Sequence, residues 1–333
     1  MPVAFDRVRP TVVWIALAVA LLVPALASGS LYLLTTASIA LVFMIYSEAW
    51  NFLAASGQGS LGHAAFFGLG AYASALTASR FGLPPALTIL FGGLFAAGIG
   101  LLIGLTCVRL KEWFLAMVTF GFAIIIQTLM VSQFAGISGG WDGTAAPALV
   151  PSSVPFAPYV QYYLVLAVLI VVLLVFRRLL RGRVGLAFAA IRENEVEARA
   201  SGIDPVRYRL FAFGLSACVA GIAGALEIHQ FGYVTPEVFG TDISFWPIIY
   251  SISGGLGTLA GPLVGTVAVT VLWEGLRGVG LTYARFVIVG LLLILTVIFL
   301  PSGLVSLPRR FQAWRRQVEK GEADVPVSDA EIG

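Results

Sequence analysis

The chain has 333 residues, of which 59% are hydrophobic and 11% charged, whereas an ordinary soluble domain carries about 25% charged residues. Mean hydropathy is +0.95. This composition excludes a soluble enzyme and indicates a polytopic protein whose main partner is the lipid bilayer. Basic residues cluster at the ends of apolar segments and in one loop, which orients a membrane protein and argues against nucleic-acid binding. The two cysteines, Cys107 and Cys218, lie in apolar segments, so we expect neither a disulfide nor a metal site.

Apolar segments long enough for membrane helices follow one another along the chain. A hydrocarbon core of about 30 Å needs about 20 apolar helical residues. The first segment is interpreted as a retained anchor rather than a cleaved signal. The predicted segments are residues 11–27, 31–50, 63–79, 86–108, 113–131, 160–176, 208–228, 244–277 and 284–300. The predicted fold is therefore an all-α membrane helix bundle with broken or re-entrant segments.

The distribution of arginine predicts how the chain is oriented. Residues 177–209 hold eight arginines, whereas residues 132–159 and 230–243 contain no Lys or Arg. By the positive-inside rule the first stretch is cytoplasmic and the other two face outside. Residues 1–307 are then a single transmembrane domain with a cytoplasmic loop at 177–209, followed by a cytoplasmic tail at 308–333.

One of the predicted segments must cross the membrane twice. A cytoplasmic tail requires an even number of crossings after Arg209, but the apolar segments give three. The longest, residues 244–277, is interrupted by glycines and by Pro262. We expect two short half-spans there, meeting at a turn on the inner side. This gives ten crossings, within a range of eight to ten.

The segment GQGSLGH, which begins at Gly57, places a polar, glycine-rich interruption between two apolar segments. Unpaired backbone groups in hydrocarbon cost several kcal/mol each, so irregular chain survives there only where protein or a water-filled cavity satisfies it. The segment therefore predicts a pathway lining, with close helix packing through glycine as the alternative. N–H groups near Ser60 and His63 could receive a substrate carboxylate. The predicted pathway residues are Asn51, Gln58, Ser60, His63 and Phe66. The predicted helix-break or gating glycines are Gly57, Gly59, Gly62, Gly254, Gly255, Gly257 and Gly261.

The arginine-rich loop contains a stretch with helical spacing of apolar residues. Phe188, Ile191 and Ala198 fall on one face, Gly202 can end a helix, and Pro205 bars its continuation. We expect one short surface helix here. The alternative is a solvated connector with charge pairs.

Five stretches, in order along the chain, carry a resemblance to a known family. They are residues 51–68, 109–120, 139–143, 190–195 and 253–262. Together they resemble the permease subunits of branched-chain amino acid ABC importers, in particular the M-type subunit, and the resemblance extends to about Pro301. It implies a pore subunit in a bacterial plasma (inner) membrane. It also implies a second related permease, two ATP-binding subunits and an extracytoplasmic solute-binding protein as partners.

Energy for transport would come from other chains. No GxxxxGK[ST] phosphate loop exists in this sequence, so the chain itself binds no cofactor, and ATP and Mg would bind the partner ATPase subunits. The family's cytoplasmic coupling helix maps onto residues 191–203. The residues predicted to couple to the ATPase are Ile191, Arg192, Glu193, Glu195, Glu197 and Gly202.

Other functions remain open at this point. The family alternative is a urea or short-chain amide importer. A self-sufficient proton-coupled transporter would use ionisable groups within the membrane, for which the candidates are Glu48, Glu227, His229 and Glu274. A serine hydrolase would use Ser60 and His63, but no nucleophile turn surrounds them. The favoured interpretation of Glu227 and His229 is that both lie at the outer interface.

Overall fold

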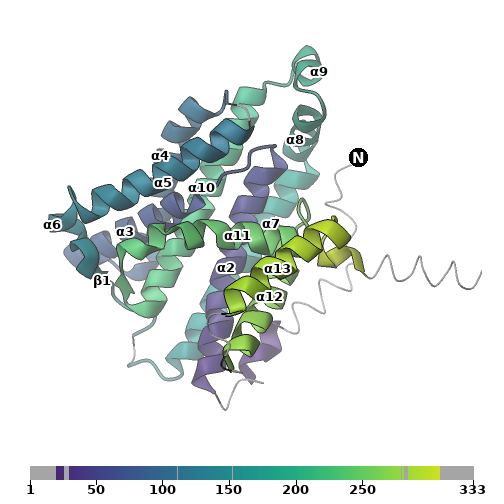
Figure 1. Cartoon of the computed structure of the whole chain (residues 1–333). Helices are drawn as coiled ribbons and strands as arrows, with labels where there is room; N and C mark the ends of the chain where they lie inside the picture. The colour runs from purple at the N-terminus through teal and green to yellow at the C-terminus, as the bar shows by residue number, and fades with distance from the viewer. Residues whose placement is uncertain are drawn as a thin grey trace, which may run out of the picture.

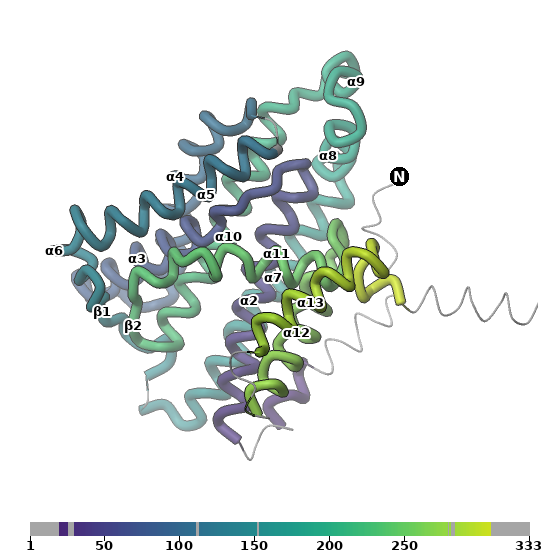
Figure 2. The backbone as a smooth tube through the Cα atoms, in the orientation of Figure 1, coloured from purple at the N-terminus to yellow at the C-terminus, as the bar shows by residue number. Residues whose placement is uncertain are grey.

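The computed structural model describes residues 20–25, 30–110, 112–151, 153–278, 280 and 284–307. They form a bundle of helices of different lengths and tilts (Figures 1 and 2). The longer helices are α2 (Leu31–Ala55), α3 (His63–Phe81), α4 (Pro85–Cys107), α5 (Glu112–Val131), α7 (Ala157–Arg181), α8 (Arg183–Glu193), α10 (Pro205–Phe231), α11 (Thr241–Gly254), α12 (Gly261–Gly278) and α13 (Ala284–Phe299). Short elements are α6 (Ala135–Ser138), η1 (Gly140–Asp142), β1 (Thr144–Ala145), α9 (Glu195–Ala200), β2 (Tyr233–Val234), η2 (Pro236–Phe239) and η3 (Leu304–Ser306).

Helix α10 is the centre of the fold and packs against α4, α3 and α2. Glycines let three of these backbones approach closely: a Cβ at Gly70 of α3 would overlap Gly221 of α10, and one at Gly92 of α4 would overlap the Gly70 carbonyl. Small residues allow such approach because no side chain separates the helices. The α3, α4 and α10 helices therefore form a tightly packed unit.

Helix α2 joins this unit to the rest of the bundle. It contacts α7 on one side and α11 and α12 on another. Phe52 of α2 stacks on Phe176 of α7 with ring centroids 4.4 Å apart. The Tyr162 hydroxyl of α7 donates to the carbonyl of Ala20, 2.9 Å away, which holds the helical residues 20–25 beside α7.

The predicted all-α membrane bundle is confirmed. Among the described residues, five helices are long and apolar enough to cross a membrane: α2, α4, α5, α7 and α10. Each predicted segment from residue 31 onward corresponds to helix in the structure. The segment at 244–277 is two helices, α11 and α12, as expected. Most of the segment at 11–27, and the tail at 308–333, lie outside the described residues; the number of crossings stays a prediction.

A two-stranded antiparallel sheet was not anticipated. Thr144 pairs with Val234 and Ala145 with Tyr233, so the two loops that lack Lys and Arg meet. This pairing requires both loops to lie on the same side of the bundle, which agrees with the common outer location predicted from their charge.

Candidate functional site

The irregular segment between α2 and α3 is held by side chains of α2 itself and of α5 and α11. The Trp50 indole N–H of α2 donates to the carbonyl of Ser60 at 2.7 Å. The N–H of Leu61 donates to Thr119 Oγ1 of α5 at 3.2 Å. The N–H of Ala64, in the first turn of α3, donates to Ser244 Oγ of α11 at 3.3 Å. Protein side chains thus satisfy backbone groups that the membrane could not, and Ser244 already occupies a position proposed for a substrate carboxylate.

The predicted pathway residues are brought together but are enclosed by the chain itself. All five are buried: Asn51, Gln58, Ser60, His63 and Phe66. Asn51 Nδ2 donates to the Thr258 carbonyl at 3.0 Å, and its Oδ1 accepts from the N–H of Gly257 at 3.0 Å. Asn51 therefore fastens α2 to the turn between α11 and α12. Their role as pathway residues stays a prediction.

The predicted gating glycines divide into three groups. A Cβ at Gly62, Gly254 or Gly261 would overlap a backbone carbonyl of a neighbouring segment. The others adopt positive φ or leave open space. Gly57, Gly255 and Gly257 have φ of 83°, 137° and 73°, and nothing lies within 4 Å of a Cβ at Gly59. Close packing and turn formation therefore explain six of these glycines without a gating role.

The loop predicted to be cytoplasmic contains two helices where one was expected. Helix α8 ends at Glu193, and α9 begins at Glu195. Between them Asn194 is extended (φ −155°, ψ 109°), and its Oδ1 accepts from the N–H of Val196 at 3.0 Å. Asparagine competes with the helix by capping the next one, so the expectation of one continuous helix was wrong. Gly202 does end the segment with φ 81°.

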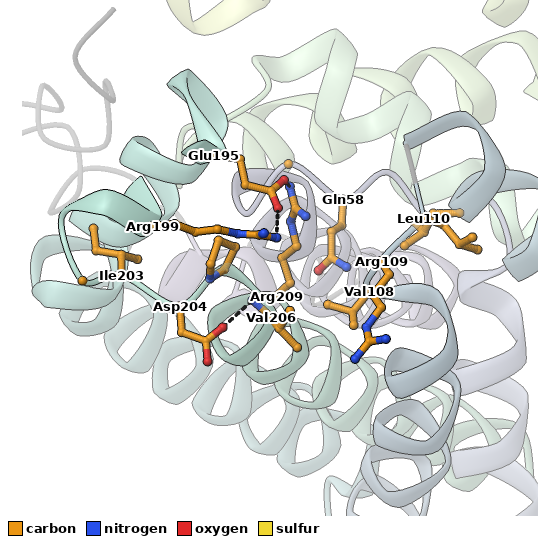
Figure 3. A pocket seen from close by; sticks show the side chains of 14 residues that line it. Gln58, Val108, Arg109, Leu110, Glu195, Arg199, Ile203, Asp204, Val206 and Arg209 are labelled. Carbon is orange, nitrogen blue, oxygen red and sulfur yellow. Dashed lines mark hydrogen bonds and ion pairs between the residues drawn. The ribbon is translucent and has the colours of Figure 1, made fainter. Parts of the chain in front are cut away.

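A pocket of about 970 Å³ lies where three connections between helices meet, each of which is called a corner below (Figure 3). One corner is Gly57 and Gln58, after α2. The second joins α4 to α5, and the third joins α9 to α10. The lining residues are Gly57, Gln58, Val108, Arg109, Leu110, Leu115, Glu195, Arg199, Gly202, Ile203, Asp204, Pro205, Val206 and Arg209. The pocket thus places the glycine-rich segment beside part of the predicted coupling loop. The other predicted coupling residues, Ile191, Arg192, Glu193 and Glu197, do not line it.

Charged residues organise this pocket, and sequence reasoning missed most of them. Glu195 accepts from Arg199 at 2.6 Å and from Arg209 at 3.0 Å, as Figure 3 shows. Asp204 pairs with Arg207 at 3.0 Å and caps α10. The Glu195 to Arg199 pair was predicted from the sequence, at i, i+4 spacing. The link to Arg209 depends on how α9 folds back toward α10.

His229 lies near the end of α10, beside the loop predicted to be outside, and its place at the outer interface stays a prediction. It is fully buried between α3 and α4. Its Nε2 lies 2.8 Å from Ser74 Oγ and 3.3 Å from Thr88 Oγ1, and its Nδ1 lies 2.6 Å from the Pro147 carbonyl. Buried polar groups are normally hydrogen-bonded, and His229 meets that requirement by joining two helices to the outer loop.

The arrangement does not support the two alternatives from other classes. Among the described residues no hydrogen bond joins any two of the proton-relay candidates, Glu48, Glu227, His229 and Glu274; Glu274 instead bonds Tyr32 and lies 3.8 Å from Arg277. His63 Nε2 lies 3.0 Å from Ser216 Oγ, not Ser60. Nor, within the described ranges, do three or more His, Cys, Asp or Glu residues cluster as metal ligands.

The fold is that of a polytopic membrane protein, with a broken helical segment beside a charged pocket at the arginine-rich loop. The family model described as branched-chain amino acid transport system / permease component matches residues 32–297. The chain belongs to this family. Membership identifies the chain as a transport subunit rather than an enzyme. It is a multi-pass inner-membrane protein that works with other subunits.

Curated relatives agree with this assignment. The chain is 32% identical to the high-affinity branched-chain amino acid transport system permease protein LivM of Escherichia coli, over 86% of this chain and 73% of that one. It is 26% identical to a probable branched-chain amino acid transport permease protein LivM of Methanocaldococcus jannaschii, over 66% and 67%. It is 29% identical to the galactose/methyl galactoside import permease protein MglC of Escherichia coli, over 65% and 66%. No solved structure matches at a significant level.

Proposed function

We propose that the chain is a permease subunit of an ATP-driven ABC importer for branched-chain or related amino acids. It forms half of the translocation pathway together with a second, related permease. Two ATP-binding subunits dock on its cytoplasmic loop, and an extracytoplasmic solute-binding protein delivers the substrate. The names of the relatives support the substrate class, and family membership supports the class of machine.

The observation that carries the proposed mechanism is the connection from α9 to α10. Glu195 of α9 is ion-paired with Arg209 of α10 at 3.0 Å, and α10 packs against α2, α3 and α4. In Figure 1 α8 and α9 project beyond the rest of the bundle. An ATPase that moves α9 would therefore displace α10 and the helices packed on it. The substrate itself can bias this movement only if its affinity differs between the two states.

Transport by a reconstituted complex tests the proposal. Proteoliposomes that contain the permeases, the ATP-binding subunits and the solute-binding protein should accumulate leucine only with ATP and Mg. Vesicles with this chain alone should be inactive. Accumulation of leucine by the single chain in response to a proton gradient would overturn the proposal, and ATP-dependent uptake of urea or acetamide without leucine uptake would favour the amide importer.

The coupling role of the loop is tested in the same vesicles. Glu193→Arg and Gly202→Pro should abolish substrate-stimulated ATPase activity while leaving membrane insertion intact. The first reverses an exposed charge on the predicted docking loop. The second ends the loop differently, because proline cannot adopt the φ of 81° that Gly202 has. Arg207→Ala is a suitable control, since the Arg207 side chain is 87% exposed. Unchanged stimulation in both loop variants would mean that the loop is only a connector.

A further inference from the structure

The pocket at the three corners lies at the ends of membrane helices. Its lining includes Gly57, just after the end of α2, and Val108, directly after the end of α4. It also includes Asp204, the residue before α10 begins. All three helices are long and apolar enough to cross a membrane. The end of such a helix lies near the boundary between hydrocarbon and headgroups, so the pocket is at the level of the lipid headgroups.

Positive charge is in excess around this pocket. The charged residues that line it are Arg109, Arg199, Arg209, Glu195 and Asp204. Both carboxylates already have cationic partners, because Glu195 pairs with Arg199 and Arg209, and Asp204 pairs with Arg207 outside the lining. Arg109 is exposed and takes part in none of the ion pairs among the described side chains. Within the described part of the chain, four arginines against two carboxylates leave an excess of two positive charges here.

Two hydrogen-bond donors in the wall of the pocket lack acceptors. Gln58 is 3% exposed, and its Oε1 accepts from Ser56 Oγ at 3.2 Å, but its Nε2 has no partner. Arg209 Nε is likewise buried and unpaired, although the same guanidinium bonds Glu195. In the view of Figure 3, Gln58 lies between Arg109 and Arg209. Buried polar groups are normally hydrogen-bonded, and both of these groups are donors, so the partner they require is an acceptor.

An apolar surface leads from the pocket along the neighbouring helices. Leu110, which lines the pocket, is exposed, and so is Leu105 in the last turn of α4. Trp113 and Phe114 at the beginning of α5 are 84% and 61% exposed, and Met117, one turn further on, is also exposed. Tryptophan is typical of the membrane–water interface. A ligand with an acceptor group in the pocket can therefore extend apolar chains over this surface.

We infer that the pocket binds the headgroup phosphate of an anionic phospholipid. The terminal torsion of a glutamine side chain is soft, so the Gln58 amide can turn its N–H groups to the phosphate oxygens. Arg209 Nε donates beside it, and Arg109 balances the charge. Bonds between a guanidinium and a phosphate are charge-assisted and strong, and basic pockets between membrane helices bind acidic headgroups. The acyl chains lie along the exposed beginning of α5. This site goes beyond the proposed function and is the same whichever solute is carried.

Titration of three probes into the assembled permease complex in dodecylmaltoside tests this inference, because a ligand that binds the folded state raises the melting temperature. Dioctanoylphosphatidylglycerol, which is anionic, should act at a lower concentration than dioctanoylphosphatidylcholine, whose headgroup has no net charge. Inorganic phosphate, which has no acyl chains, should neither stabilise the complex nor displace the lipid. Equal midpoint concentrations for the two lipids would overturn the inference. Stabilisation by inorganic phosphate, with displacement of the lipid, would assign the pocket to a free anion and overturn the lipid assignment.

Matched variants connect the effect to the pocket. Arg109→Gln should raise the midpoint concentration of dioctanoylphosphatidylglycerol about fivefold, the contribution of one basic residue near an anionic lipid. Gln58→Glu keeps the size of the side chain but replaces the donor by an acceptor, and it should also raise the midpoint. Arg183→Gln removes an exposed arginine at the start of α8 that does not line the pocket, and it should behave like the wild type.

The exposed position of Arg109 keeps the test independent of folding. Arg109→Gln should have the melting temperature of the wild type when no lipid is added, because its side chain is exposed and has no ion pair to lose among the described side chains. Midpoints that are the same in the wild type, Arg109→Gln and Gln58→Glu would refute the site. None of these measurements requires transport, so their outcome is separate from that of the proposed function.

Discussion

The Arg209 guanidinium lies 3.0 Å from the carboxylate of Glu195 and ties α9 to α10. The Arg209 side chain is 19% exposed, whereas Arg199, the other partner of Glu195, is 60% exposed. Solvent screens an exposed pair more strongly. The contact with Arg209 is therefore the stronger mechanical link, and the contact with Arg199 supports α9 locally.

Reversing the charge of Glu195 should uncouple transport. Glu195→Arg places a third cation beside Arg199 and Arg209 and should remove substrate-stimulated ATPase activity. The double variant Glu195→Arg/Arg209→Glu should recover most of it, because the pair is restored in reverse. Arg199→Ala should change the activity little. An inactive double variant with normal assembly would show that the identity of these residues matters beyond their pairing.

Gly59 and Gly62, which are three residues apart, should respond differently to substitution by alanine. Gly62→Ala would drive a methyl group into the Thr119 carbonyl, whereas Gly59→Ala meets nothing within 4 Å. We expect Gly62→Ala to lower the yield of folded protein severely and Gly59→Ala to behave like the wild type. Size-exclusion profiles and melting temperatures in detergent measure this difference. Equal stability of the two variants would contradict the packing described for the start of α3.

Removing the Asn51 amide should destabilise the bundle. Asn51→Ala leaves the Gly257 N–H and the Thr258 carbonyl without their partners, at a cost of about 1–3 kcal/mol for an unsatisfied buried group. The melting temperature should fall by several degrees. Thr77→Ala is the control, because the Thr77 hydroxyl bonds only carbonyls of its own helix. A variant with normal stability but altered transport would instead favour the pathway role predicted for Asn51.

Cysteine labelling measures the orientation of the chain. In a background with Cys107 and Cys218 replaced, Ser153→Cys should react with an impermeant thiol reagent added outside, and Ser201→Cys should react only after permeabilisation. Both positions are exposed, so reactivity reports the side of the membrane. Outside labelling of Ser201→Cys with protection of Ser153→Cys would invert the topology.

Hydropathy and charge predicted the helices well because membrane helices must be long, apolar and internally hydrogen-bonded. The break at 255–260 was also readable, since Gly254, Gly255 and Gly257 interrupt the segment. The break at Asn194 was missed. Its residues have helical spacing on both sides, and only the competition between capping and continuation decides the outcome.

The contacts that build the candidate site could not be predicted, because they join distant parts of the chain. Ser244 of α11 accepts a hydrogen bond from the N–H of Ala64 in α3. Arg209 of α10 pairs with Glu195 only once α9 has folded against α10. Sequence spacing predicts which residues share one face of a helix. It does not predict which other helix packs against that face.

The bond between Asn51 and the turn at Gly257 and Thr258 has a consequence for biosynthesis. The amide enters the membrane early, yet its partners emerge from the ribosome only after 206 further residues. Until then α2 must hold an unpaired polar group, so it remains loosely packed or borrows another partner. Final closure of the bundle therefore waits for the α11–α12 turn, and nascent chains truncated before residue 257 should be preferred substrates of membrane proteases.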